Sequence, residues 1–175
     1  VMGVFAPILW DKLNPYQQRR LLVFLDPSAD PRNSGYHLIQ SQVAIGSGGF
    51  FGKGFTDGSQ KRLAFLPAQH TDFIYSVLGE EFGFFGVAVV LSLFAVFLLR
   101  TIRIAGRATN PFASLAAFGV MATLLTHILV NVGMTIGLMP ITGIPLPFFS
   151  YGGSFMLSCW LSVGILVLVS AEGRR

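Results

Sequence analysis

The sequence predicts an all-α integral membrane protein, a polytopic helix bundle with a large folded extracytoplasmic loop. Of its 175 residues, 53% are hydrophobic and 11% are charged, whereas about 25% are charged in an ordinary soluble domain. The charges are also clustered, because residues 11–72 carry 12 of the 20 and the other 113 residues carry 8. This composition excludes a soluble enzyme domain, a disordered tail and a DNA-binding module. The formal charge of +4 follows membrane topology, so no nucleic-acid partner is expected.

Three segments are apolar enough to cross a bilayer, which requires about 20 residues. They lie at 73–99, where the helix begins at the interface, at 112–138 and at 154–171. Segment 1–10 is too short to span and is interpreted as the end of a transmembrane helix that begins earlier in a longer protein. The sequence therefore predicts the end of one span followed by three complete ones.

Arginines predict the orientation of these spans. Three lie in the short linker 100–111 and two in the tail 172–175, so the positive-inside rule makes both segments cytoplasmic. Loops 11–72 and 139–153 then share the extracytoplasmic side. Loop 11–72 carries seven basic residues, but loops of about 60 residues translocate largely regardless of charge. Its apolar content predicts a loop folded onto the membrane surface.

The large loop contains a glycine-rich stretch, Gly46-Ser47-Gly48-Gly49-Phe50-Phe51-Gly52-Lys53-Gly54. It is not a Walker loop, because Ser47 stands where a glycine is needed and Gly54 where Ser or Thr is needed. Two interpretations remain. The glycines allow tight turns beside the bilayer, or backbone N–H groups and Lys53 cradle a pyrophosphate headgroup. Upstream, Tyr36–Ile45 predicts a short helix with Ile39 and Val43 on one face.

Three carboxylates lie where the large loop enters the next helix. Asp72 is either an N-cap or a carboxylate at the water–membrane boundary, where burial would raise its pKa and suit it as a general base. His70 is placed to orient it. Glu80 and Glu81 follow eight and nine residues later, about 12 Å deeper along a helix. They are functional groups inside the membrane, or the span begins near Phe82 and they remain at the interface.

Two further features lie on or after the second span. Thr123, His127, Asn131 and Thr135 recur every four residues and so share one helix face. That face predicts either interhelical hydrogen bonds or a polar path for a headgroup. Loop 139–153 has three prolines and three glycines yet is apolar. Because irregular backbone is not tolerated in contact with lipid, it is expected to pack against protein or line a wet cavity.

Two blocks of sequence resemble the SEDS family, the RodA/FtsW group of shape, elongation, division and sporulation proteins. The resemblance covers nearly the whole chain and is closer to RodA than to FtsW. The first block is Gln40-Ser41, Ala44-Ile45-Gly46-Ser47-Gly48-Gly49, Gly52-Lys53-Gly54, Phe65-Leu66-Pro67, His70-Thr71-Asp72-Phe73-Ile74 and Glu80-Glu81-x-Gly83. The second block is Gly137-Leu138-Met139-Pro140, Thr142-Gly143-Ile144-Pro145-Leu146-Pro147 and Ser150-Tyr151-Gly152-Gly153-Ser154.

The resemblance implies a bacterial membrane protein of ten helices, of which this chain is the C-terminal half. Family members are peptidoglycan glycosyltransferases that polymerise lipid II on the outer face of the cytoplasmic (inner) membrane. They work with a class B penicillin-binding protein, and the N-terminal half of the same protein would complete the site. The family's essential aspartate falls on Asp72. The resemblance also implies a divalent cation, Mg²⁺ or Mn²⁺, whose ligands it does not identify.

The resulting hypothesis is glycosyl transfer between two lipid-linked disaccharides, with Asp72 as the catalytic general base. Alternatives are a flippase or transporter of the same lipid, and a non-catalytic scaffold for the penicillin-binding protein. Eight further residues are candidates for substrate binding: Lys53, Lys61, Arg62, His70, Glu80, Glu81, Ser150 and Tyr151.

Overall fold

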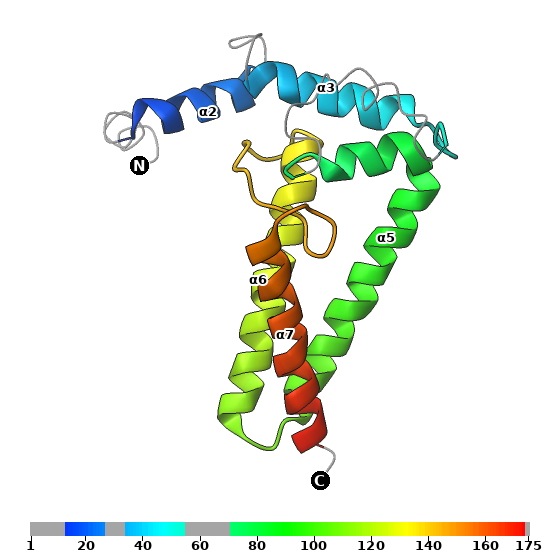
Figure 1. Ribbon diagram of the computed structural model, residues 1–175. Coiled ribbons are helices and arrows are strands. Elements are labelled where there is room, and N and C mark those ends of the chain that lie inside the picture. Colours follow the sequence, from blue (N-terminus) through cyan, green and yellow to red (C-terminus); the bar gives the residue numbers. More distant parts are fainter. Residues whose placement is uncertain (1–12, 27–33, 55–70, 174–175) are drawn as a thin grey trace, which may run out of the picture.

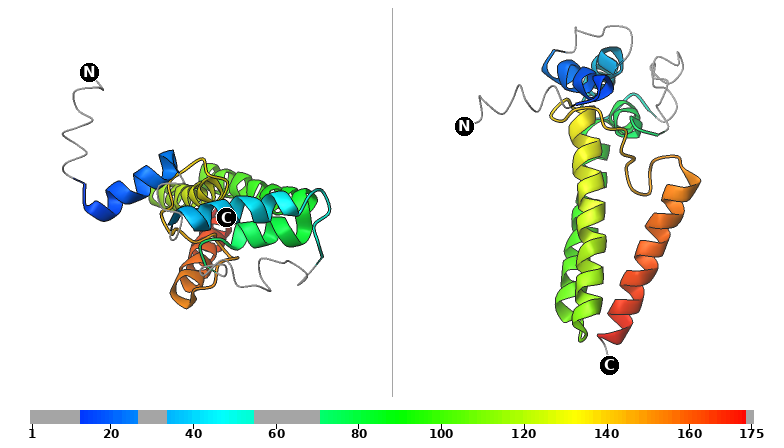
Figure 2. Two further views of the ribbon diagram at one scale, coloured as in Figure 1. Left: turned by 90° about the horizontal axis from the view of Figure 1, so that it is seen from above. Right: turned by 90° about the vertical axis from the view of Figure 1, so that its left-hand side faces the viewer.

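The computed structural model describes residues 13–26, 34–54 and 71–173, which form helices and contain no strand (Figure 1). The helices are α2 (Pro15–Leu25), α3 (Ser34–Ser47), α5 (Ile74–Arg107), α6 (Pro111–Thr135) and α7 (Gly153–Glu172). Figures 1 and 2 show α2, α3 and the first part of α5 lying across one end of a bundle, which consists of the rest of α5 with α6 and α7. The predicted all-α class is confirmed.

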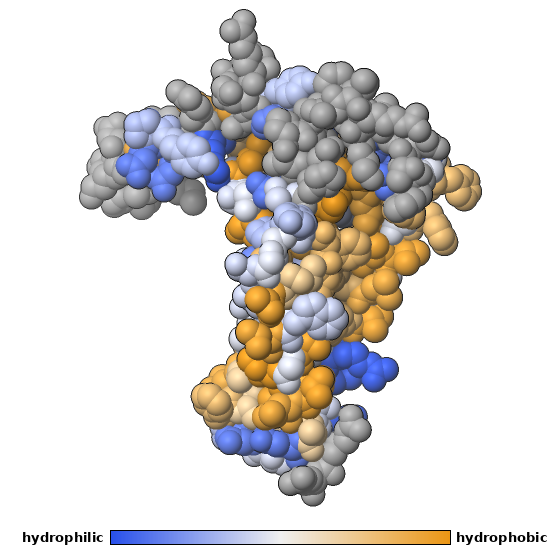
Figure 3. All heavy atoms as spheres, viewed as in Figure 1, coloured by the Kyte–Doolittle hydropathy of each residue, from blue (hydrophilic) through white to orange (hydrophobic). Residues whose placement is uncertain are grey.

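The bundle helices α5, α6 and α7 are each long and apolar enough to cross a membrane. They fall on the three segments predicted to span, and they expose large apolar side chains such as Leu93, Phe112 and Leu168. Figure 3 shows an apolar surface over much of the bundle, with hydrophilic residues towards both of its ends. Such a surface is stable when lipid surrounds it, as in a multi-pass membrane protein.

Helix α5 bends at Gly83, whose backbone (φ 64°, ψ −165°) is not helical. The bend separates an arm, residues 74–82, from the α5 span, residues 84–107. Figure 1 shows the arm lying below α3 and the span descending from its far end. Glu80 and Glu81 therefore lie on the arm and not within the span, as the interfacial interpretation of these residues predicted.

Residues 48–54, the glycine loop, complete the backbone hydrogen bonds that this bend leaves open. Two N–H groups of the loop donate to carbonyl groups at the end of the arm, and two N–H groups of the first turn of the span donate to loop carbonyls. A bend buried without such partners would cost the desolvation of each group. The four pairs, with N···O distances of 2.9–3.1 Å, are Lys53–Glu80, Gly54–Glu81, Phe84–Gly49 and Phe85–Phe50.

Substitution of Gly52 tests whether the glycine loop supports the bend. A Cβ at Gly52 would lie 2.1 Å from the Glu81 carbonyl oxygen, and its φ of +77° disfavours any other residue. We expect Gly52→Ala to destabilise the protein by about 1–3 kcal/mol and to speed amide exchange at Phe84 and Phe85. Gly46→Ala on α3 is the matched control, because a Cβ there meets nothing within 4 Å. Thermal unfolding and hydrogen exchange measure both effects, and equal behaviour of the two variants would contradict the assigned role.

Helix α3 packs on the arm through small residues and through Ile45, which lies beside Gly79. Helix α3 confirms the short helix predicted at Tyr36–Ile45, and Ile39 and Val43 on it are 41% and 49% exposed. The buried hydroxyl of Ser41 donates to the Thr135 carbonyl oxygen at 2.8 Å and lies 2.5 Å from the Ser76 hydroxyl. Because a hydroxyl has one proton, Ser76 is the donor in the second bond. This chain of hydrogen bonds joins α3, the arm and the end of α6.

Two predicted boundaries of the spans need correction. The linker predicted at 100–111 is mostly helical, since α5 continues to Arg107 and α6 begins at Pro111, where the Asn110 side chain accepts a hydrogen bond from the Phe112 N–H at 2.9 Å. The second span ends at Thr135 and not at residue 138. Its last turn closes when the N–H of Leu138 donates to the Gly133 carbonyl, a C-terminal capping pattern.

Two clusters of buried apolar side chains hold the bundle together. One lies where the end of α5, the start of α6 and the end of α7 meet, and its small alanines allow close approach of the helices. The other joins the arm, the α5 span, α6 and the loop before α7, and it therefore holds the elements that carry the candidate site. The first contains Ala105, Ala113, Ala117, Leu166 and Val169, and the second contains Tyr75, Phe94, Ile128 and Leu146.

Candidate active site

Asp72 lies in the turn that leads into the arm, and its side chain is partly buried. Helix α5 has Phe73 as its N-cap and no side-chain capping hydrogen bond, so the N-cap interpretation of Asp72 is wrong. No hydrogen bond to the Asp72 carboxylate occurs among residues 13–26, 34–54 and 71–173. Within the described residues, a substrate would therefore displace no partner of this carboxylate.

The main chain of this turn is held from two directions. Asn131 of α6 is fully buried and donates from Nδ2 to the Asp72 carbonyl oxygen at 3.0 Å. Ser150 is 1% exposed and donates from Oγ to the Thr71 carbonyl oxygen at 2.6 Å. Its Oγ also accepts from the Leu146 N–H at 2.7 Å. Two consecutive carbonyls are therefore fixed, and with them the direction in which the Asp72 side chain leaves the backbone.

The same face of α6 holds the loop that follows it. Asn131 Nδ2 donates a second hydrogen bond, to the Ile144 carbonyl oxygen at 2.8 Å. His127 Nδ1 lies 3.2 Å from the Pro145 carbonyl oxygen, and it must be the donor because a carbonyl only accepts. Of the polar face predicted from residues spaced by four, His127 and Asn131 thus bond to the backbone of loop 136–152 and of the Asp72 turn, whereas the hydroxyls of Thr123 and Thr135 bond to carbonyls within α6.

Loop 136–152 forms one wall of the space around Asp72. A Cβ on Gly143 would lie 3.3 Å from Asp72 Oδ2, so a side chain there would press on the carboxylate. The structure also has a groove of about 590 Å³ whose lining includes Ile74, two residues after Asp72 in the sequence. Tyr151, which is 80% exposed, forms part of the wall of this groove. The groove is lined by Ile74, Phe149, Ser150, Tyr151, Gly152, Gly153 and Met156.

Two of the predicted substrate ligands lie on the groove described above, and the others that the structure describes do not. Ser150 and Tyr151 lie on this groove, although the Ser150 hydroxyl is engaged by the protein's own backbone. Sequence reasoning missed Gly143 as a neighbour of the carboxylate, and it treated Asn131 as a helix-packing residue. The sequence did contain a signal that Asn131 has a special role, because it is one of four polar residues that recur every four positions in an apolar helix.

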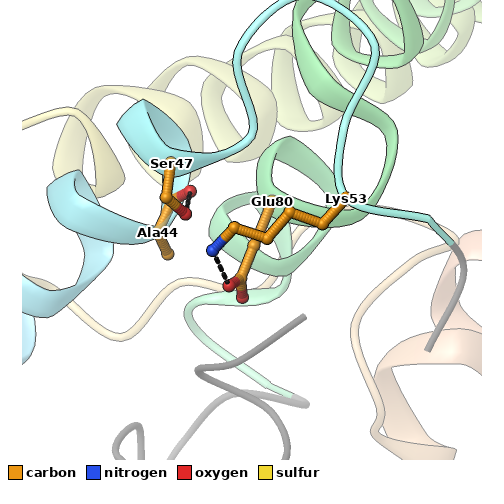
Figure 4. Close-up of polar contacts among 4 residues, drawn as sticks. All are labelled: Ala44, Ser47, Lys53 and Glu80. Atoms are coloured by element: carbon orange, nitrogen blue, oxygen red, sulfur yellow. Dashed lines mark hydrogen bonds and ion pairs between the residues drawn. The ribbon is translucent and has the colours of Figure 1, made fainter. Parts of the chain in front are cut away.

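Lys53 and Glu80 form an ion pair at the other end of the arm. Lys53 Nζ lies 2.8 Å from Glu80 Oε1, and the two side chains are 32% and 1% exposed. Figure 4 shows the lysine reaching from the glycine loop to the arm, beside Ser47 of α3. Glu81 is also buried. Glu80 lies eight residues after Asp72, about 12 Å further along the arm, so this pair is separate from the groove.

The backbone of the glycine loop is occupied by contacts with α5. The N–H groups of Lys53 and Gly54, two of those in the stretch that the cradle interpretation assigned to a pyrophosphate, donate to the carbonyls of Glu80 and Glu81. The interpretation in which glycines allow close turns accounts for this geometry. Binding of substrate by Lys53, Glu80 or Glu81 stays a prediction.

A double-mutant cycle tests the Lys53–Glu80 pair. Removing one partner of a buried pair costs about 3–5 kcal/mol, and the partial exposure of Lys53 lowers our expectation for Lys53→Met to about 1–3 kcal/mol. The double variant Lys53→Met/Glu80→Gln should recover part of that loss, because no unpaired charge is left. Equilibrium unfolding in mixed detergent micelles measures the coupling, and additive effects of the two substitutions would contradict it.

Three predicted site residues, Lys61, Arg62 and His70, lie outside the residues that the structure describes. Within the described residues, no three His, Cys, Asp or Glu side chains gather to hold a metal ion. Among the residues that the structure describes, Asp72 alone offers a carboxylate at the start of the arm. A Mg²⁺ ion there would need substrate phosphates as its other ligands, so the described residues do not themselves form a site for the implied cation.

Comparison with known proteins identifies relatives of the whole chain. The family model described as FtsW/RodA/SpoVE cell cycle protein matches residues 1–175. The peptidoglycan glycosyltransferase RodA of Treponema pallidum is 48% identical over 91% of this chain and 37% of its own length. A probable peptidoglycan glycosyltransferase FtsW of Geobacter sp. (strain M18) is also 48% identical, over 91% of this chain and 43% of its own length. The predicted closer likeness to RodA therefore stays a prediction.

The fold is also similar to a solved structure. A chain from a structure that describes coordination of polymerization and crosslinking by a peptidoglycan synthase complex superposes with a TM-score of 0.73. It is 34% identical, and the match covers 98% of this chain and 48% of that one. The chain spans about half the length, or less, of the curated relatives that it matches.

Proposed function

This chain belongs to the FtsW/RodA/SpoVE family of SEDS proteins, and from that premise we propose that it carries the catalytic aspartate of a peptidoglycan glycosyltransferase. The reaction is the polymerisation of lipid II into glycan strands for the bacterial cell wall. The relatives that bear this name support it. The N-terminal half found in those relatives would supply the other helices of the ten-helix fold and the rest of the substrate site.

In the proposed reaction Asp72 is the general base. Its carboxylate takes the proton from a sugar hydroxyl of the acceptor, and that oxygen attacks the anomeric carbon of the donor sugar. The bond from this carbon to the pyrophosphate oxygen breaks, and polyprenyl pyrophosphate leaves, with inversion at the carbon. Pyrophosphate is a good leaving group, so no acid is required. Chemistry of this kind depends on a base held within hydrogen-bond reach of the hydroxyl.

One observation carries the proposal. The Asp72 carboxylate accepts no hydrogen bond from the residues that the structure describes, while Asn131 and Ser150 fix the main chain that bears it. A carboxylate with a structural role would be expected to have its own partners. A base needs an unoccupied carboxylate on a rigid support, and the groove that contains Tyr151 is lined by Ser150, which holds the Thr71 carbonyl next to Asp72.

The departing pyrophosphate requires positive charge. Within this chain the candidates are Lys61 and Arg62, together with Lys53 if substrate replaces Glu80 as its partner. A divalent cation, Mg²⁺ or Mn²⁺, remains part of the proposal, because such an ion would neutralise phosphate charge. We assign it no ligand in this chain.

The proposed cellular setting follows from the family. The protein lies in the bacterial cytoplasmic (inner) membrane, with Asp72 at its outer face, and a class B penicillin-binding protein crosslinks the strands that it makes. The description of the similar solved structure, which names both polymerization and crosslinking, supports such a partner.

Purified complete protein with its transpeptidase partner and lipid II tests the proposal directly. Glycan chains resolved on a gel are the expected product. Two alternatives predict other results: a flippase moves lipid II across vesicles without making polymer, and a scaffold makes polymer only when another polymerase is present. If the folded complex is supplied with lipid II and makes no polymer, the proposal is overturned.

A further inference from the structure

Four exposed phenylalanines gather at the corner where the glycine loop meets the α5 span. Phe50 and Phe51 form the tip of the loop and are 74% and 88% exposed, and Phe84 and Phe85 begin the span and are 65% and 67% exposed. The rings of Phe50 and Phe84 meet edge to face, with centroids 6.0 Å apart. These four residues, the aromatic corner, thus continue the apolar surface of the span onto a loop.

The height of the loop tip is fixed relative to the span. The N–H groups of Phe84 and Phe85 donate to the carbonyls of Gly49 and Phe50 at 2.9 and 3.1 Å, so the loop moves with the first turn of the span. Lys53 is the one charged residue among residues 48–54. Its ammonium group lies 2.8 Å from the Glu80 carboxylate. Because this charge is paired within the protein, it does not by itself require the tip of the loop to be in water.

Helix geometry places this corner at the edge of the hydrocarbon core. Three exposed arginines, Arg100, Arg103 and Arg107, mark the opposite end of α5. From Arg103 to Phe84 the rise is about 28 Å at 1.5 Å per residue, and the core is about 30 Å thick. If Arg100 marks the boundary instead, the core reaches about 6 Å beyond Phe84. Either boundary places Phe84, which is hydrogen-bonded to the glycine loop, within about 6 Å of the edge of the core.

We propose that Phe50 and Phe51 insert into the bilayer beside Phe84 and Phe85, at the boundary of the hydrocarbon core. The glycine loop is then a membrane-dipping loop, and its partner is the lipid surface. Through its hydrogen bonds to α5, the inserted tip holds the arm at the level of the headgroups, and so sets the depth of Asp72. This inference rests on the membrane embedding of the helices and does not depend on glycosyl transfer.

Fluorescence quenching in the complete protein tests the insertion. An environment-sensitive fluorophore is attached at Phe51→Cys, with Cys159→Ala and any other cysteine removed, and the protein is reconstituted in phosphatidylcholine vesicles. We expect strong quenching by a lipid with a nitroxide near its headgroup, weaker quenching by one with a nitroxide at the chain end, and little quenching by aqueous iodide. Leu93→Cys on the span and Gly46→Cys on α3 are the lipid-facing and water-facing controls.

Two results would overturn the inference. Quenching of the Phe51 probe by iodide to the level of the Gly46 probe would place the loop in water. Protection from both lipid nitroxides and iodide would mean that protein, such as the N-terminal half, covers the aromatic corner. Quenching reports the surroundings of the labelled residue alone, so the test of insertion is independent of polymerase activity.

Discussion

Replacing Asp72 with asparagine is expected to stop glycan polymerisation while leaving the protein folded. A positioned general base contributes about 10²–10⁴-fold in rate, so the initial rate of polymer formation from lipid II should fall by about that factor. Stability should be retained, because the contact with Asn131 uses the backbone carbonyl of Asp72 and the carboxylate accepts no hydrogen bond within the described part of the chain. The gel assay with the transpeptidase partner gives the rate, and thermal unfolding gives the stability.

A matched control separates loss of the base from loss of a charge. Glu172→Gln removes a carboxylate from the opposite end of the bundle, at the exposed end of α7, and should polymerise at the wild-type rate. If Asp72→Asn also polymerises at that rate, Asp72 is not the base and the proposed mechanism fails.

The same pair of variants separates the three candidate functions. A flippase would keep its lipid II transport in Asp72→Asn, because its function would lie along the span. A scaffold would tolerate the substitution in every assay. Only an enzyme that uses the carboxylate would lose polymerisation while keeping its fold and its partner.

The membrane helices were predictable because charge-poor segments of about 20 residues have few stable forms other than a spanning helix. The bend in α5 was not predictable in the same way. Gly83 alone does not distinguish a bend from a tolerated glycine, and the hydrogen bonds that stabilise the bend come from the glycine loop, residues 48–54, about 30 residues earlier in the chain. The predicted ends of the helices were wrong for a different reason: the arginines in the last turns of α5 were interpreted as part of a linker, although they are helical.

The site was predictable only in part. Asp72 could be found from its motif and from its position at the entrance to a span. Its supports could not, because Asn131 lies 59 residues away along the chain and the Ser150–Thr71 contact spans 79 residues. Spacing within one helix places Asn131 on a polar face, but tertiary structure decides which carbonyl it meets.

Asn131 should therefore control the rate of the reaction without touching the substrate. Asn131→Asp keeps the shape of the side chain but removes both donors, and it sets a carboxylate against the Asp72 and Ile144 carbonyls. Because a displacement of about 1 Å can cost about 10²-fold in rate, we expect kcat to fall by about 10–10²-fold with KM little changed. Steady-state kinetics on lipid II measure this split. Thr123→Ala is the control, since its exposed hydroxyl bonds only within α6, to Gly119.

A second residue, Ser150, allows an experiment that distinguishes positioning of Asp72 from general damage to the fold. Asn131 and Ser150 hold adjacent carbonyls of one turn, so releasing either should already free Asp72, and Asn131→Ala/Ser150→Ala should cost less than the product of the two single effects. Two unrelated packing defects would instead multiply, and they would lower thermal stability together. A multiplicative loss of kcat, or a rise in KM that accounts for the whole effect, would show that these residues do not act by positioning Asp72.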